Sequence, residues 1–215
     1  IDGINWDDEL NSSGYNEGFG YPAYSQASYA RSGLARFRIN TGYSGTPGNT
    51  QTAWSNYRRR FKNELMARVQ AEIQSIKTNP RQPLRHTIAP IAYSPVPSSC
   101  TFSGSAPYTY FCDWAGMLQN GYVDAAMPQT YSSSTFNTWA DRCANCWQYN
   151  RQIFSGIGAY LYGNATIASE ISSLRSKGLK GYCTYSYAAS STDGGWWAYA
   201  AANVNTSTAT IPSMP

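Results

Sequence analysis

The sequence predicts an α/β protein with five βα units around a parallel sheet. Strand-like apolar segments alternate with helical patterns, and repeated βα units imply parallel strands covered by helices. The chain of 215 residues can bury one core, and its 15% aromatic content argues against disorder. Five units are too few for a complete eight-unit barrel, and no glycine-rich phosphate loop marks a dinucleotide-binding fold. A five-stranded open sheet and the carboxyl-terminal part of a barrel both satisfy this order.

The first predicted strand begins near Gly3 and ends in the acids Asp7, Asp8 and Glu9. Successive strand side chains face opposite sides, so Asn5 and Asp7 share one face, and the apolar residues between them share the other. A helix would cover the apolar face. Asp7 would then point inward at the carboxyl end of the strand, where catalytic groups collect in α/β sheets and barrels. The alternative is that the acids cap a loop or the next helix.

A long loop is expected from Leu10 to Thr50, because this stretch is rich in Gly, Tyr, Asn and Ser. A helix follows from Trp54 to Ile76, with an apolar stripe predicted to be core. The stripe consists of Trp54, Tyr57, Phe61, Leu65, Val69, Ile73 and Ile76. Arg58, Arg59, Arg60 and Lys62 lie on this helix and are interpreted as a solvated face. With a net charge of only +4 and no nucleic-acid-binding motif, no nucleic-acid partner is expected.

The remaining elements follow in βα order. Pro128 is unusual in a buried strand, so it is expected near the strand end or at a bulge. The predicted domain covers residues 1–204, and the Ser/Thr/Pro-rich stretch 205–215 is interpreted as a tail or linker. The predicted strands are 84–93, 122–131, 153–162 and 179–187, and the predicted helices are 110–120, 136–149, 166–177 and 195–202.

The five cysteines predict one loop-closing disulfide. Cys100 and Cys112 flank a polar loop and are expected to pair, which would stabilise the fold by roughly 3 kcal/mol. The remaining three cannot all pair within the chain. A bond between Cys143 and Cys146 is expected, which leaves Cys183 buried in the last strand.

The composition predicts an extracellular glycoprotein. Lys and Glu are scarce, the cysteines look paired, and sequons begin at Asn11, Asn164 and Asn205. The single histidine, His86, is distant from the Cys-x-x-Cys pair, so no metal or cofactor is expected. No apolar run reaches the roughly 18 residues of a membrane span, so none is predicted. The chain starts with Ile and is interpreted as processed or truncated.

Several motifs together resemble the glycosyl-hydrolase-like barrel family of family-ten type. The opening Ile1–Asp8 resembles the family's fourth strand, and the segment from Trp54 to Lys77 its fourth helix. The stretch Asp113–Asp124, which leads into Pro-Gln-Thr-Tyr at Pro128–Tyr131, resembles the family's aspartate-tryptophan helix and sixth strand. Gly156–Tyr160 resembles the seventh strand, and Gly181–Tyr187 resembles the eighth. One departure is Ala89–Tyr93, where the family tends to show a Ser-Pro pair.

By this resemblance the chain holds strands four to eight of a TIM (β/α)8 barrel, with the first strands upstream or in a partner chain. The implied function is that of a secreted glycoside hydrolase acting on a polysaccharide or glycan. The expected catalytic residues are Asp7 and Asp8, and the expected substrate-binding residues are Glu9, Gln129, Tyr131, Tyr185, Tyr187 and Trp196, the last as part of an exposed Trp196-Trp197 pair.

Glycosidic cleavage generally needs two carboxylates. No second strong carboxylate follows Asp7 at a strand end, and Asp193 is a weak candidate. The alternative function is therefore a non-catalytic extracellular protein that uses a degenerate barrel for sugar binding or assembly.

Overall fold

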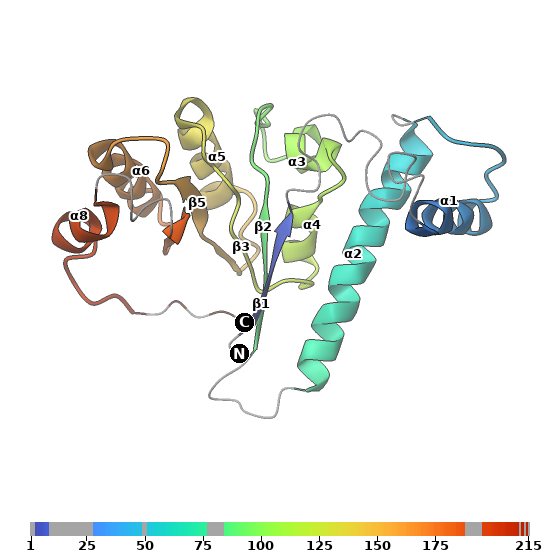
Figure 1. Ribbon diagram of the computed structural model, residues 1–215, viewed down its shortest axis with the longest axis horizontal. Coiled ribbons are helices and arrows are strands. Elements are labelled where there is room, and N and C mark those ends of the chain that lie inside the picture. The colour runs from blue at the N-terminus through green and yellow to red at the C-terminus, as the bar shows by residue number, and fades with distance from the viewer. Residues whose placement is uncertain are drawn as a thin grey trace.

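The computed structural model describes residues 3–8, 28–48, 51–76, 84–187, 195–210, 212 and 214. It shows a mixed α/β architecture with a four-stranded parallel sheet (Figure 1). This arrangement is consistent with part of a (β/α) barrel. Among the described residues, no helix is long and apolar enough to cross a membrane.

The strands are short and all their pairings are parallel. The four-stranded sheet has the order β1-β2-β3-β4, and β5 pairs with β6 in a second sheet. Isolated parallel bridges from Gln129 to Ile91 and to Gly156 extend the pairing past the end of β3. The strand bounds are β1 Gly3–Asp8, β2 Arg85–Pro90, β3 Ala125–Ala126, β4 Gln152–Ile153, β5 Ser155–Gly158 and β6 Tyr182–Tyr185.

The helices follow the strands along the chain, and their contacts are also largely sequential: α2 packs against α4, α5 against α6, and α6 against α8 (Figure 1). A 3-10 turn, Phe102–Gly104, precedes α3. The helix bounds are α1 Ser28–Thr41, α2 Thr52–Ser75, α3 Ala106–Thr109, α4 Trp114–Gln119, α5 Ser133–Asn145, α6 Asn164–Ser176 and α8 Trp196–Asn203.

The two faces of the strands differ in polarity. On β2, Ile88 is buried in the core, whereas Thr87 donates a hydrogen bond to the Asn5 Oδ1 atom on β1 over 2.8 Å. Asn5 is paired in register with Thr87, and Asp7 with Ala89. Asn5 and Asp7 therefore share the face opposite the core, as the alternation predicted.

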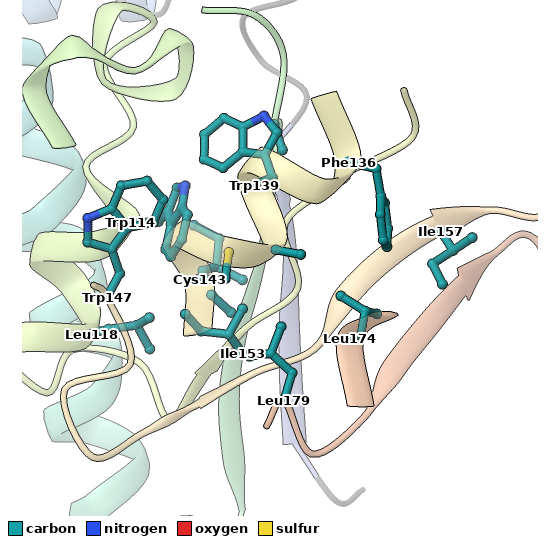
Figure 2. Close-up of a cluster of buried hydrophobic side chains, with 14 of the residues drawn as sticks. Trp114, Leu118, Phe136, Trp139, Cys143, Trp147, Ile153, Ile157, Leu174 and Leu179 are labelled. Atoms are coloured by element: carbon teal, nitrogen blue, oxygen red, sulfur yellow. The ribbon is translucent and has the colours of Figure 1, made fainter. Parts of the chain in front are cut away.

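The core lies between the sheet and α4, α5 and α6, and it is unusually rich in tryptophan. Trp114, Trp139 and Trp147 are fully buried and lie together above Ile153 of β4 (Figure 2). The rings of Trp114 and Trp147 meet edge to face at a centroid distance of 5.5 Å, a favoured geometry for aromatic pairs. These tryptophans thus pack the core of the fold.

The expectation of one uninterrupted loop from Leu10 to Thr50 is wrong over α1, which occupies Ser28–Thr41. This helix buries Phe37 against Trp54 and Tyr57 at the start of α2, so tertiary packing stabilises a segment whose own apolar periodicity is weak. Residues 10–27 and 49–50 lie outside the described residues.

Two further helical expectations need correction. Two residues of the apolar stripe that was expected to be core are exposed: Leu65 on α2 by 40%, and Ile76 just past its end by 60%. The buried face of the helix runs instead through Met66 and Ile73. The helix expected over 110–120 begins only at Trp114, where the Asp113 carboxylate caps it by accepting a hydrogen bond from Gly116 N over 3.1 Å.

The cysteine pairing was also predicted wrongly. Cys100 forms its disulfide with Cys146, 46 residues away, and neither expected bond exists. Cys112 and Cys143 point into the core and are fully buried, whereas Cys100 lies in an exposed loop. That loop is held at the end of α5 because Trp147 Nε1 donates to the Cys100 carbonyl. Cys183 is half-buried on β6 and takes no part in a disulfide.

Arg58 is not part of a solvated face. Its side chain is buried with the guanidinium carbon 3.5 Å from the centroid of the Phe111 ring and 5.3 Å from that of Trp54. Arg58 therefore joins α2 to the turn before α4 through cation–π contacts. Arg60 remains on the surface in an ion pair with Glu64, as expected for a solvated residue.

A buried polar network ties α2 to the sheet. Trp6 Nε1 donates to His86 Nε2 over 2.8 Å, so the imidazole proton resides on Nδ1, which donates to the Gln70 Oε1 atom over 3.1 Å. Gln70 Nε2 in turn donates to the Asp124 carboxylate, which also accepts from the His86 backbone N–H. Burial lowers the pKa of His86, and this favours the neutral ring that the network requires.

We expect Glu170 on α6 to make stability depend on pH. Burial raises the pKa of its carboxyl to about 7 from an ordinary value of 4.5. Between these values the folded state holds a proton that the unfolded state has released, so stability falls as the pH rises through this window. Glu170→Gln should unfold at a higher temperature than the wild type at pH 8, and the two should differ less at pH 4. An equal difference at both pH values would contradict this assignment.

Candidate active site

The candidate site lies at the carboxyl edge of the parallel strands. Asp7 is the penultimate residue of β1, and its side chain is exposed on the face opposite the core. The strand fixes this direction, because Trp6 before it packs against the core cluster and the pleat reverses at each residue. Asp7 therefore presents a carboxylate to solvent on a rigid strand.

Gln129 reaches Asp7 from the end of β3. Its Nε2 atom donates to Asp7 Oδ1 over 3.0 Å and to the Ala89 carbonyl over 3.1 Å. Gln129 directly follows Pro128, which lies beyond β3 as expected for a strand-end proline, and its backbone bridges both neighbouring strands. This pairing joins two residues 122 positions apart, and it orients the Asp7 carboxylate.

The two acceptors on Nε2 also fix which way the Gln129 amide points. Both N–H groups are used, so the opposite atom must be the oxygen. Within the described ranges, that Oε1 atom finds no hydrogen-bond partner, and the residue is only 4% exposed. An unmet buried acceptor of this kind costs about 1–3 kcal/mol, so the amide is set up to accept a hydrogen bond from a group outside the described chain.

Three tyrosines gather beside this carboxyl edge. Tyr131 stands two residues after Gln129, Tyr160 follows β5, and Tyr185 ends β6. The Tyr131 and Tyr185 rings are stacked at 5.8 Å and an interplanar angle of 26°. Tyr160 meets both rings edge on, at centroid distances of 6.4 Å from Tyr131 and 5.9 Å from Tyr185. We refer to these three residues as the tyrosine cluster.

A second aromatic pair lies farther along the chain from β6. Tyr187 is 77% exposed, and its ring packs against Trp197 of α8 at a centroid distance of 5.5 Å. The expectation that Trp196 is an exposed stacking residue is wrong, because Trp196 is fully buried in the core. Of the two consecutive tryptophans, Trp197 is the one that faces solvent, with 39% of its surface exposed. Adjacent helical residues point about 100° apart, so only one of two consecutive tryptophans can face the core.

Tyr160 is not among the site residues expected from the sequence, and Trp197 is among them only as the neighbour of Trp196. The position of Tyr160 just past the end of β5 matches that of Tyr131 past β3, and this shared position could have identified it. The Asp8 side chain, Glu9 and Asp193 lie outside the described part of the chain.

Three other carboxylates that the sequence suggested as candidates do not lie at the candidate site. Asp124 is buried in the network with His86, and Asp141 pairs with Lys177 over 2.6 Å on the helical layer. Glu170 lies in the middle of α6. Over the described ranges, no group of three or more His, Cys, Asp or Glu side chains is arranged to hold a metal ion. The described site thus consists of one oriented carboxylate, one amide and exposed aromatic rings.

This combination defines a class of protein: an α/β protein that carries a carboxylate and aromatic side chains at the carboxyl edge of a parallel sheet. The family model described as Glycosyl hydrolase-like 10 matches residues 1–170, and the chain belongs to that family. The resemblance seen in the motifs is thereby confirmed, and it indicates a glycosyl-hydrolase-like function. A search of curated proteins finds no match to the chain.

Proposed function

We propose that this protein is a secreted glycoside hydrolase that acts on a polysaccharide or glycan, with Asp7 as one of its two catalytic carboxylates. The observation that carries the proposal is the hydrogen bond from Gln129 to Asp7 at the carboxyl edge of the strands. The amide N–H donates to Asp7 Oδ1 and so holds the carboxylate in one orientation. An oriented carboxylate is suited to act as a nucleophile or a general base.

The second carboxylate would come from outside the described residues. Candidates are Asp8, Glu9 and a strand-end acid in an upstream segment or partner chain that completes a (β/α)8 barrel. The described strands support such completion, because β1 pairs with β2 alone and β6 with β5 alone. Their outer edges leave backbone hydrogen-bonding groups for further strands.

An extracellular location is part of the proposal. The Cys100–Cys146 disulfide supports it, since such bonds persist in oxidising compartments. Of the three sequons, Asn164 and Asn205 lie in the described part of the chain. The Asn205 side chain is exposed but is also bonded to Tyr182. Secretion with glycan attachment would be checked by expression in a glycosylating host and mass analysis of the secreted protein.

The first experiment measures hydrolysis by the complete protein on a panel of plant and bacterial polysaccharides, with released reducing ends as the readout. The proposal expects cleavage of at least one substrate. The stereochemistry of the first product, followed by NMR, would then assign a retaining or an inverting mechanism. Saccharide binding without any cleavage would favour the alternative, a non-catalytic sugar-binding or assembly protein. The exposed aromatic rings also fit that alternative.

We expect Gln129→Leu to lower kcat by about 10- to 100-fold while KM changes little. Leucine has nearly the same size but removes both N–H donors, so Asp7 loses its orientation while the surrounding strands remain in place. Gln129→Glu is the complementary variant, because it places a like charge beside Asp7 and should move the pH profile of kcat. Unchanged kcat in both variants would rule out a positioning role for Gln129.

A further inference from the structure

We propose that the tyrosine cluster and the Tyr187–Trp197 pair form two neighbouring stacking subsites for a linear oligosaccharide. The exposed face of Tyr185 would take one pyranose ring, and Tyr187 with Trp197 would take a neighbouring unit. This inference rests on the proposed function, and it adds the residues that hold the glycan and the minimum length of the substrate.

The exposure of these rings sets them apart from the other aromatic clusters. The core rings Trp114 and Trp147 are fully buried, whereas Tyr160 is 41% and Tyr185 is 50% exposed. Each of the three rings in the cluster nevertheless contacts the other two, as rings in the core do. Tyr131 stacks against Tyr185 and Tyr160 packs against it in a T-shaped arrangement, while half of the Tyr185 surface stays exposed.

The backbone around the cluster holds the rings in place. Ala159 N donates to the Tyr185 carbonyl over 3.1 Å, which joins the ends of β5 and β6. Gly158 leaves the space that Tyr131 and Leu161 need, because a Cβ there would meet Leu161 Cδ1 at 2.8 Å and Tyr131 Cβ at 3.4 Å. A platform ordered before binding loses little conformational entropy on binding.

The chemistry of these rings suits an uncharged sugar. The face of an aromatic ring carries partial negative charge, and the C–H groups on one side of a pyranose ring are weakly positive. Tyrosine hydroxyls can both donate to and accept from sugar hydroxyls. Pyranoses whose hydroxyls are equatorial, such as glucose and N-acetylglucosamine, present the flattest C–H faces.

Two neighbouring stacking subsites imply that the ligand is an oligosaccharide rather than a monosaccharide. Tyr185 and Tyr187 are two residues apart, so their Cα atoms lie within about 7 Å of each other. That spacing is comparable to the repeat of a linear pyranose chain. The tyrosine cluster includes Tyr131, two residues after the Gln129 that contacts Asp7, and the second subsite includes Trp197 of α8. A chain that occupies both would therefore run along the carboxyl edge of the strands.

The test measures binding by calorimetry, with the complete protein in an Asp7→Asn background so that no ligand is consumed. The probes are cello-oligosaccharides and chito-oligosaccharides from the monosaccharide to the hexasaccharide. At least one series should bind, and affinity should rise with chain length. Tyr185→Ala should weaken binding about five- to tenfold, while Tyr185→Phe should retain most of it, because the ring is kept. Tyr187→Ala should weaken binding of the disaccharide and of longer ligands and leave that of the monosaccharide unchanged.

Tyr149→Ala is the matched control, since Tyr149 is 40% exposed but lies beyond α5, outside both subsites. Circular dichroism of each variant verifies folding. Failure of every probe to bind the folded protein, or equal weakening by Tyr149→Ala, would overturn the subsites. Binding without hydrolysis by the wild type would keep the subsites and reject the catalytic proposal. Hydrolysis with an unchanged KM in Tyr185→Ala would keep catalysis and reject the subsites.

Discussion

Asp7→Asn is expected to reduce hydrolysis by the complete protein by at least about 10²- to 10⁴-fold. This range is typical for the loss of a general acid or base, and the loss of a nucleophile is larger. The fold should be unaffected, because asparagine keeps the shape of the side chain and its Oδ1 atom can still accept the hydrogen bond from Gln129. The negative charge and the capacity to exchange a proton are lost.

The measurement compares kcat on the best substrate of the polysaccharide panel. Asp141→Asn is the matched control: it makes the same chemical change at a surface ion pair on α5 and should leave kcat unchanged. Thermal unfolding of both variants separates catalysis from stability. Wild-type kcat in a folded Asp7→Asn protein would remove Asp7 from the mechanism, and with it the main support for the proposed function.

Removal of the disulfide by the double substitution Cys100→Ser and Cys146→Ser is expected to lower the free energy of unfolding by about 4 kcal/mol. The bond closes a loop across a sequence separation of 46 residues, and the chain-entropy model gives this value for a loop of that length. Replacing both cysteines avoids leaving one exposed thiol. Urea unfolding with a linear extrapolation measures the difference.

A reducing agent provides an internal control. It should destabilise the wild type to nearly the level of the double variant and should leave the double variant unchanged. Peptide mapping of the oxidised protein tests the connectivity directly, with Cys112→Ser as the variant that retains the bond. A Cys100–Cys112 linkage in the map, or equal stability of oxidised and reduced wild type, would contradict the structure.

Local patterns in the sequence were enough for the α/β class, the parallel strands and the direction of Asp7. They did not predict α1 or the division of the expected strand 153–162 into β4 and β5. Strand alternation predicted that Asn5 and Asp7 share one face and Trp6 the other, because the period of two depends only on the backbone. The expected helical cover of Ile4 is not observed, since Ile4 is 45% exposed. Apolar periodicity predicted α2, α5 and α6 to within a few residues. Resemblance of local motifs also identified the family, which the match over residues 1–170 confirms.

Contacts between residues that lie far apart in the sequence could not be predicted from local patterns. The contact between Asp7 and Gln129 depends on how β1, β2 and β3 lie side by side, and no local pattern encodes it. The disulfide partner of Cys100 was missed for a similar reason. Trp147 holds the loop that carries Cys100 at the end of α5, and this places Cys100 beside Cys146. The prediction had considered only the separation of the cysteines along the chain.

The exposure of aromatic and charged side chains was likewise decided by tertiary packing. Trp196 and Trp197 are chemically identical neighbours, yet the rotation of α8 against the core buries the first and exposes the second. Arg58 belongs to a charged run but is buried, because Trp54 and Phe111 come together around its guanidinium. The sequence by itself determined the α/β class, the face of Asp7 and the family. The tertiary structure decided which side chains meet at the carboxyl edge, because burial and contact depend on the packing of whole elements against one another.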